Sequence, residues 1–379
     1  NGFEKGYLLA PSLSVKVKDK LSFSLAAELY NGANTSKQII FFYFPPSQLN
    51  ATNPKELGID YKRTYSAQDI FQVSKNNNFF GQMNYKFSNQ WRSQTNFTST
   101  NSFSDGPYAY FYVIPNSEVT GNPNATGADY LARADQSTAN STDQATEIQQ
   151  NFIGDFKIGN LRNRFVGGLD FFSQNSNQLF YGENFDTIPK NGNIPAYGNF
   201  NKDNLNAALQ KNTPWTYPYR YKTNTYSAYV SDVLNITDKL IASAAIRADH
   251  FSNKGSYDQS TGQYTGSYDQ TAFSPKFGLV YQPVKDKIAF FANYQNGFTN
   301  MTGTDYNGKT FKPEEAAQIE GGVKLNAFGG RLNGTISYYD IQVKDIVRPY
   351  AANPNFSIQD GTQLSKGVEA EIVAKPAQG

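Results

Sequence analysis

The chain of 379 residues carries a net charge of +2, with 39% hydrophobic and 15% aromatic residues. It has no cysteine and one histidine, which excludes a disulfide framework and a thiolate metal site. Its basic residues are scattered rather than clustered, which argues against a nucleic-acid partner. No stretch approaches the roughly 20 consecutive apolar residues of a membrane helix, so any membrane crossing has to be made by strands.

Six short polar turns punctuate the sequence, and each separates two predicted strands. In chain order they lie at residues 18–20, 88–90, 159–160, 237–239, 284–287 and 328–330. Longer connections are expected between the hairpins, at residues 31–77, 99–146, 173–224, 252–271, 296–313 and 348–363. Short turns at one end of every strand pair and long loops at the other are typical of a transmembrane β-barrel.

The predicted strands alternate in polarity, because successive side chains of a strand point to opposite faces. The first of them places Leu21, Phe23, Leu25, Ala27 and Leu29 on one face and Ser22, Ser24 and Glu28 on the other. Most segments reach about 9 to 11 residues, the length with which a tilted strand crosses a bilayer. The many aromatic residues suit the girdles at the two membrane interfaces. A soluble all-β binding module would also alternate, so it stays an alternative.

Residues 132–150 form a polar run rich in Ser, Thr, Asp, Gln and Asn, which predicts a mobile loop. Asp305, Asn307 and Gly308 resemble part of a calcium loop. The bidentate Glu of such a loop is missing at its twelfth position, so an ordinary turn is expected.

Two motifs invite comparison with hydrolases. His250 precedes Ser252 by two residues, but nucleophilic catalysis also needs a third group that orients the histidine. Glu314 and Glu315 are adjacent, and adjacent residues of a strand point to opposite faces, whereas a glycosidase needs two facing carboxylates. We therefore expect His250 to be a polar residue at the membrane interface. We expect no catalytic residue, no metal site, no cofactor and no enzymatic activity.

Three segments of the last third of the chain, taken in order, carry a family resemblance. They are residues 272–281 (AFSPKFGLVY), 311–324 (FKPEEAAQIEGGVK) and 365–371 (SKGVEAE). Their order and spacing resemble barrel strands of TonB-dependent outer-membrane receptors, particularly siderophore receptors. The matching positions are Pro313, Glu314, Gln318, Glu320, Gly322, Lys324, Gly367 and Glu369. The resemblance covers residues 225–375, and before residue 225 it rests on the rhythm of the hairpins.

This resemblance implies a bacterial outer-membrane barrel of 22 antiparallel strands, plugged by a separate N-terminal domain. Such a receptor imports a scarce nutrient with energy supplied by the TonB complex through the plug. The rhythm of the present chain predicts an all-β fold with about thirteen of these strands. We expect residues 1–379 to be one partial barrel domain without the plug. It would start a few strands into the barrel and stop about six strands short of its end.

Two predicted loops are rich in aromatic residues and are the candidate ligand contacts. One carries Tyr108, Tyr110 and Tyr112, and the other carries Trp215, Tyr217, Tyr219, Arg220 and Tyr221. Aromatic faces together with an arginine could stack on and neutralise an anionic iron chelate bearing catechol or hydroxamate groups. The structural alternative is that these rings only pack the loops or mark where strands leave the membrane.

The expected partners are a ferric siderophore or another small nutrient, the lipid bilayer, and the TonB complex through the plug. Two alternatives share the predicted barrel: a passive porin, and a TonB-dependent receptor for cobalamin or a carbohydrate.

Overall fold

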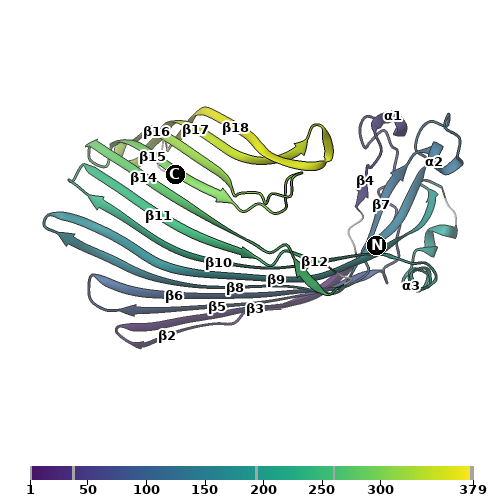
Figure 1. Ribbon diagram of the computed structural model, residues 1–379, viewed down its shortest axis with the longest axis horizontal. Helices are drawn as coiled ribbons and strands as arrows, with labels where there is room; N and C mark the ends of the chain where they lie inside the picture. Colours follow the sequence, from purple (N-terminus) through teal and green to yellow (C-terminus); the bar gives the residue numbers. More distant parts are fainter. Residues whose placement is uncertain (1, 36–38, 193–194, 259–260, 376–379) are drawn as a thin grey trace.

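The computed structural model describes residues 2–35, 39–192, 195–258 and 261–375. Antiparallel strands dominate it (Figure 1). The strands are β1 Glu4–Leu9, β2 Ser12–Lys18, β3 Leu21–Thr35, β4 Ile40–Phe41, β5 Phe71–Lys86, β6 Trp91–Gly106, β7 Ala109–Ile114, β8 Tyr130–Ile158, β9 Leu161–Pro189, β10 Trp215–Asn235, β11 Leu240–Asn253, β12 Ser256–Asp258, β13 Gln263–Thr265, β14 Tyr268–Val284, β15 Ile288–Thr299, β16 Glu314–Ala327, β17 Leu332–Tyr350 and β18 Asn353–Ala374.

Five short helical segments accompany the strands: α1 Pro46–Leu49, α2 Asn116–Thr120, η1 Pro195–Asn199, α3 Lys202–Lys211 and η2 Phe328–Gly330. Among the described residues, no helix has the length and apolar character needed to cross a membrane.

The main sheet is a meander that curves into an open wall (Figure 1). Its order is β1-β3-β5-β6-β8-β9-β10-β11-β14-β15-β16-β17-β18, and neighbours along this path are antiparallel. β1 and β2 both pair with β3 and are separated around Pro11, so they occupy one position in the wall. This makes thirteen wall positions, as the sequence predicted. The six predicted hairpins are present, with their tight turns at one end of the wall.

The strands are longer than the sequence indicated. β8 and β9 contain 29 residues each, about three times the 9 to 11 residues that a tilted strand needs to cross a bilayer. The predicted loop at residues 132–150 is wrong, because this run lies inside β8. Backbone hydrogen bonds to β6 or β7 on one side and to β9 on the other hold the run extended despite its polar side chains. The other predicted connections are shortened at both ends for the same reason, except residues 296–313, which are shortened only at their start.

Polar and apolar side chains occupy opposite faces of the wall. One row of register partners contains Leu25, Gly81, Phe97, Ile148, Phe171 and Tyr226, and most of these side chains are exposed and apolar. The neighbouring row contains Ser24, Gln82, Asn96, Gln149, Asp170 and Ser227. In this second row Gln82 donates to Asn96 over 3.0 Å, and Asn96 donates to Gln149 over 3.2 Å. The alternation therefore gives a polar concave face and an apolar convex face.

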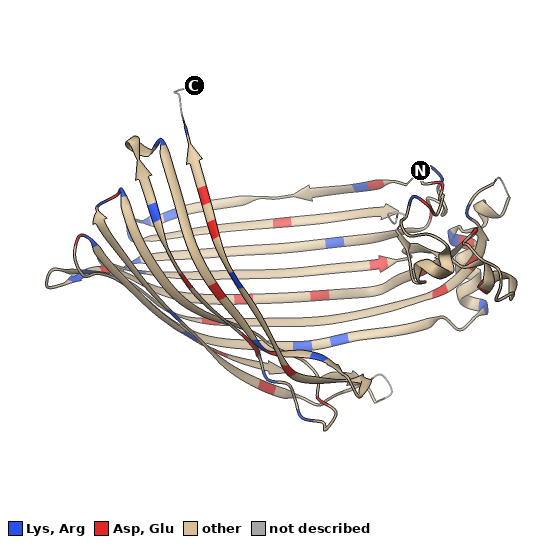
Figure 2. Ribbon diagram, turned by 90° about the horizontal axis from the view of Figure 1, so that it is seen from above, with Lys and Arg blue, Asp and Glu red and all other residues tan. Residues whose placement is uncertain are grey.

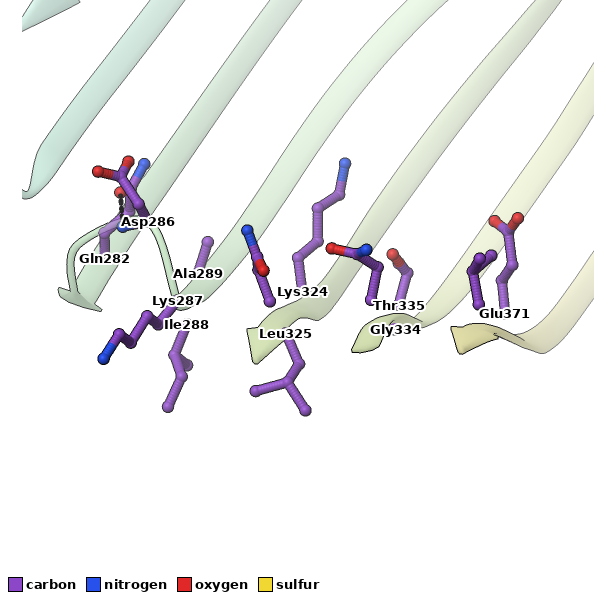
Figure 3. Close-up of a pocket in the computed structure, with 13 residues that line it drawn as sticks. Gln282, Asp286, Lys287, Ile288, Ala289, Lys324, Leu325, Gly334, Thr335 and Glu371 are labelled. Carbon is purple, nitrogen blue, oxygen red and sulfur yellow. Dashed lines mark hydrogen bonds between the residues drawn. The ribbon is translucent and has the colours of Figure 1, made fainter. Parts of the chain in front are cut away.

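The same division is visible beside the tight turns of β14–β18 (Figure 3). Lys324, Thr335 and Glu371 are register partners on three adjacent strands and point to one side, where they line a hollow. Ile288 and Leu325 point to the other side. Figure 2 shows acidic and basic residues spread over the strands without a patch of one sign. This distribution fits a water-facing lumen better than a nucleic-acid surface.

Aromatic rings on the convex face gather at two levels. Near the turns, the Trp91 ring lies 5.1 Å from that of Phe156 and 5.8 Å from that of Phe165. Further along the strands, Phe171 and Tyr226 lie 5.1 Å apart. His250 is the register partner of Tyr226, and its Nδ1 lies 3.0 Å from Thr271 Oγ1. The two levels have the arrangement of membrane-interface girdles, with His250 at the level further from the turns.

The two faces predict different tolerance for charge at adjacent positions. Ile246 is exposed and lies on the same face of β11 as His250, the partner of the convex residue Tyr226. Ala245 lies on the opposite face with Arg247, which pairs with the concave residue Asp170. We expect Ile246→Lys to destabilise the protein in lipid vesicles by about 2–4 kcal/mol, because it places an ammonium in the bilayer. Ala245→Lys should cost much less. Denaturant unfolding of both variants measures the difference, and equal costs would contradict the assignment of the faces.

Candidate ligand-binding face

The end of the wall opposite the tight turns, here called the mouth, carries an additional small sheet (Figure 1). β7 pairs antiparallel with the first residues of β8, and β4 pairs in parallel with β7. The short helices α1, α2 and α3 lie around this sheet. The mouth is therefore built mostly from segments that the sequence assigned to loops.

The back of this small sheet is covered by an apolar core. Phe111, Val113 and Leu131 are fully buried there, together with Ile70, Phe200 and Leu205 from other segments. The rings of Phe111 and Phe200 meet edge to face at 6.5 Å, and those of Phe185 and Phe200 stack at 4.7 Å. The core joins the described parts of residues 39–70 and 190–214 to the sheet, so these connections are packed rather than free.

A buried arginine lies within this core. Arg133 is fully buried, and its Nε and Nη2 donate to the two carboxylate oxygens of Asp186 over 2.6 and 2.5 Å. Nη1 donates to the carbonyls of Tyr65 and Tyr197 over 3.1 and 2.9 Å, and Nη2 also donates to the carbonyl of Ala196 over 2.9 Å. One guanidinium thus binds a carboxylate of β9 and backbone carbonyls of two other segments.

The front of the small sheet presents exposed rings. Phe41 and Tyr43 stack with ring centres 5.4 Å apart, Phe41 meets Tyr110 at 5.7 Å, and Tyr43 meets Tyr112 at 5.4 Å. Partial burial raises the pKa of Tyr110 and of Tyr112, and the neighbouring Tyr43 adds to both shifts. These hydroxyls therefore stay protonated at neutral pH and can donate hydrogen bonds.

Tyr108 precedes this group and is held through its backbone. Its N–H donates to Ser137 Oγ over 3.3 Å, and its carbonyl accepts from the N–H of Gln136 over 2.9 Å. The two contacts fix the start of β7 against β8.

A second set of rings lies along β10. Trp215, Tyr217, Tyr219 and Tyr221 occupy alternate positions and therefore share a face, with 5.3 to 6.3 Å between successive tyrosine ring centres. The Tyr221 hydroxyl donates to Asp143 over 3.3 Å. Burial, followed by the charge of Asp143, raises the pKa of Tyr221 to about 12. Trp215, Tyr217 and Tyr219 are between 41% and 57% exposed, so their rings are open to solvent.

The strand register places both sets of rings on one face. Tyr110 lies opposite Ala134, which lies opposite Asn184, and Trp215 lies opposite Gly182, which lies opposite Gln136. Ala134 and Gln136, like Gly182 and Asn184, are two residues apart and face the same side. β7 and β10 are three strand steps apart, which corresponds to about 14 Å. We call this surface the aromatic face: Phe41, Tyr43, Tyr110, Tyr112, Trp215, Tyr217, Tyr219 and Tyr221.

Small residues separate the two halves of the aromatic face. Ala132 and Ala134 lie opposite Tyr112 and Tyr110. A Cβ atom on Gly182 would lie 2.7 Å from the Trp215 ring and 2.0 Å from the carbonyl oxygen of Asp135, so only glycine fits there. The absence of a side chain at Gly182 lets the indole lie close to the sheet.

Arg220 does not join the aromatic face. It follows Tyr219 in β10 and therefore points to the opposite side, where its guanidinium carbon lies 4.3 Å from the centre of the Tyr257 ring. The structure thus separates Arg220 from the rings beside which the sequence placed it. Phe41 and Tyr43 belong to the aromatic face as well, although the sequence did not predict them as ligand contacts. Their signal is the apolar and aromatic run at residues 40–44 inside a predicted connection.

The described residues contain no group of three or more His, Asp or Glu side chains placed to hold a metal ion. Neither motif compared with hydrolases assembles a catalytic group in the interactions seen. His250 contacts Thr271, and Glu314 and Glu315 are the alternating first residues of β16. Asp305 accepts from the N–H groups of Asn307 and Lys309, which makes the predicted turn.

Comparison with known proteins identifies the family. The model of the family described as "TonB dependent receptor-like, beta-barrel" matches residues 22–375. The chain belongs to this family, as its sequence motifs predicted.

Individual relatives are more distant. The chain is 24% identical over 238 residues to the metal-pseudopaline receptor CntO of Pseudomonas aeruginosa, an alignment that covers 59% of this chain and 31% of that receptor. It is 24% identical over 250 residues to the ferripyoverdine receptor of P. aeruginosa, covering 61% and 30% of the two chains. The crystal structure of the ferripyoverdine receptor bound to ferripyoverdine superimposes with a TM-score of 0.77 at 18% identity, covering all of this chain and 48% of that one. The chain thus spans about half of a solved receptor.

A buried carboxylate at the base of the mouth makes the stability of this region depend on pH. Asp135 is fully buried and accepts from Ser137 Oγ over 2.6 Å and from the N–H of Glu183 over 2.9 Å. Burial raises its pKa, and the charge of Glu183 adds to the shift. Folding therefore disfavours the ionised form of Asp135. Its contribution to stability is most favourable below the unfolded pKa of about 3.9 and is lost as the pH rises through the folded pKa.

We expect Asp135→Asn to remove this pH dependence. The variant should unfold at a higher temperature than the wild type at pH 7, with a smaller difference at pH 4. Thermal unfolding at the two pH values measures this effect. Asp286→Asn, at an exposed turn residue with φ of 60°, is the matched control and should show no such trend. A lower melting temperature of Asp135→Asn at pH 7 would contradict the expectation.

Proposed function

We propose that this chain is part of the barrel of a TonB-dependent receptor that takes up a ferric siderophore or a similar metal chelate across the bacterial outer membrane. Further strands would close the barrel, and a plug domain would connect it to the TonB complex. Family membership supports this proposal, as do the apolar convex face and the polar concave face. The relatives named as metal-pseudopaline and ferripyoverdine receptors support a metal chelate as the cargo.

The aromatic face is the proposed capture surface. The observation that carries the proposal is that Tyr110, Tyr112 and the β10 rings, about 100 residues apart in sequence, share one face of the sheet. On this face Tyr110 and Tyr112 are partly buried, whereas Trp215, Tyr217 and Tyr219 are exposed to solvent. Exposed patches of large apolar side chains commonly mark binding surfaces, which supports ligand contact over packing alone. Tyrosine and tryptophan combine a large apolar area with a hydrogen-bonding group, which suits a chelate that carries rings and oxygen ligands.

The alternative functions are less well supported than uptake of a metal chelate. The family match favours an energised receptor over a passive porin. We propose that the protein has no enzymatic activity, in keeping with relatives named as receptors. Uptake of cobalamin or a carbohydrate would use the same wall, and direct binding measurements with each class of ligand separate these possibilities.

Removing rings from the aromatic face should weaken binding. We expect Tyr110→Ala combined with Tyr112→Ala to raise the Kd for a bound metal chelate at least about tenfold, which corresponds to about 1.4 kcal/mol. Trp215→Ala combined with Tyr219→Ala should act similarly. Quenching of intrinsic fluorescence in the complete receptor, titrated with ferripyoverdine and with metal-loaded pseudopaline, measures the change.

Arg220→Ala is the matched control, because Arg220 lies on the same strand but faces away from the rings. It should leave the Kd unchanged. Unchanged affinity in both double variants, with binding intact in the wild type, would remove the aromatic face from the binding site.

A further inference from the structure

Arg133 lies directly behind the aromatic face. It stands between Ala132 and Ala134 in β8, and these two residues are the register partners of Tyr112 and Tyr110. Because side chains alternate along a strand, Arg133 projects from the back while its neighbours lie beneath the rings at the front. The register partner of Arg133 in β7 is Phe111, the core residue between the two tyrosines. The position of β7 therefore depends on the contacts that Arg133 makes behind the sheet.

The contacts of Arg133 come from three segments outside β7 and β8. Asp186 belongs to β9, Tyr65 to the connection before β5, and Ala196 and Tyr197 to η1. The guanidinium carbon also lies 5.3 Å from the centre of the Phe200 ring and 5.8 Å from that of Phe185. All of these contacts are made on the back of the sheet.

The strand pairing is irregular at this point. Between Arg133 and Ala134 the register of β8 against β9 shifts, so that Arg133 pairs with Asp186 and Ala134 with Asn184. Phe185 is the extra residue of this β-bulge and packs against the apolar core. A bulge bends its strand locally, and this one lies midway along the stretch of β8, residues 130–135, that pairs with β7. The bidentate pair of Arg133 and Asp186 holds the two strands together beside the bend.

We propose that Arg133 is a positioning residue for the aromatic face. It holds the β7–β8 extension against β9 and the segments behind the sheet, and thereby fixes the places of Tyr110 and Tyr112 relative to the rings of β10. Because β4 pairs with β7, it also fixes Phe41 and Tyr43. Arg133 does not contact the ligand. Its relevance to capture rests on the proposed function, whereas its effect on ring positions can be measured without any ligand.

The chemistry of the contacts requires arginine. Four acceptor groups surround the guanidinium, namely the Asp186 carboxylate and three backbone carbonyls. A planar fork with five N–H donors serves them together, whereas the ammonium of lysine has three donors at one point. Arg133→Lys therefore keeps the positive charge but should lose some of the hydrogen bonds to the Asp186 carboxylate and the three carbonyls.

The test uses the complete receptor with spin labels at Tyr112→Cys in β7 and Lys222→Cys in β10, a design helped by the absence of cysteine from this chain. Pulsed electron paramagnetic resonance gives the distribution of distances between the labels. We expect a narrow distribution with native Arg133, a broader one in Arg133→Lys and the broadest in Arg133→Met. Heat-modifiable migration on gels checks that each variant forms a barrel. If Arg133→Met fails to fold, Arg133→Lys and Asp186→Asn carry the test.

Arg162→Met is the matched control. Arg162 and Asp155 form the same kind of bidentate pair, with distances of 2.9 and 2.6 Å, at the turn end of the same β8–β9 hairpin. That pair is half exposed and far from the mouth. Its loss should leave the distance distribution unchanged. A distribution that stays narrow in folded Arg133→Lys and Asp186→Asn variants would overturn the proposal.

A binding measurement separates this inference from the proposed function. With ferripyoverdine or metal-loaded pseudopaline as the probe, Arg133→Lys should raise the Kd about tenfold, equivalent to about 1.4 kcal/mol. If removing the rings weakens binding while Arg133→Lys neither broadens the distance distribution nor raises the Kd, positioning by Arg133 is refuted and the capture surface stands. If the distance distribution broadens while removal of the rings changes nothing, the capture surface is refuted and the positioning role stands.

Discussion

The wall depends on one constraint: every strand that crosses a bilayer must satisfy its backbone groups on neighbouring strands while its side chains divide between lipid and water. The meander meets this demand for every strand between its two outer strands, and the division of side chains follows from the pleat alone. Rows of exposed apolar residues therefore alternate with rows in which Gln82, Asn96 and Gln149 hydrogen-bond across strands. The polar face does not require charge, because amide side chains satisfy one another there.

The mouth is stabilised in a different way from the wall. Beyond the membrane-spanning part the strands meet water instead of lipid, so the extension buries apolar side chains in a core of its own, and it forms that core on its back. The front is left with rings that no other described segment covers. A buried arginine is a costly means of joining segments, because an ion taken out of water must recover its hydration through close contacts. Arg133 recovers it through a bidentate carboxylate and three carbonyls, and removing Asp186 alone would leave a buried charge without its counter-ion.

The wall could be predicted from the sequence because its determinants are local. Tight polar turns, alternation in polarity and the motifs around Glu320 and Glu369 specify hairpins without knowledge of distant contacts. The mouth could not be predicted in this way. Residues 132–150 have the composition of a loop, and only pairing with β9 and with β6 or β7 makes them a strand. Phe41 reaches the aromatic face because β4 pairs in parallel with β7, and no local sequence pattern predicts such a pairing. Arg220 shows the converse case: neighbours in sequence point apart once the segment is a strand.

The length of β8 and β9 determines how far the aromatic face lies from the membrane. At about 3.3 Å per residue, a strand of 29 residues is about 95 Å long, and only about a third of it is needed to cross the bilayer. The remainder holds the rings beyond the lipid headgroups on stiff, paired strands rather than on a flexible loop. For the proposed capture surface, this height means that a bulky ligand would reach the rings without first entering the layer next to the lipid.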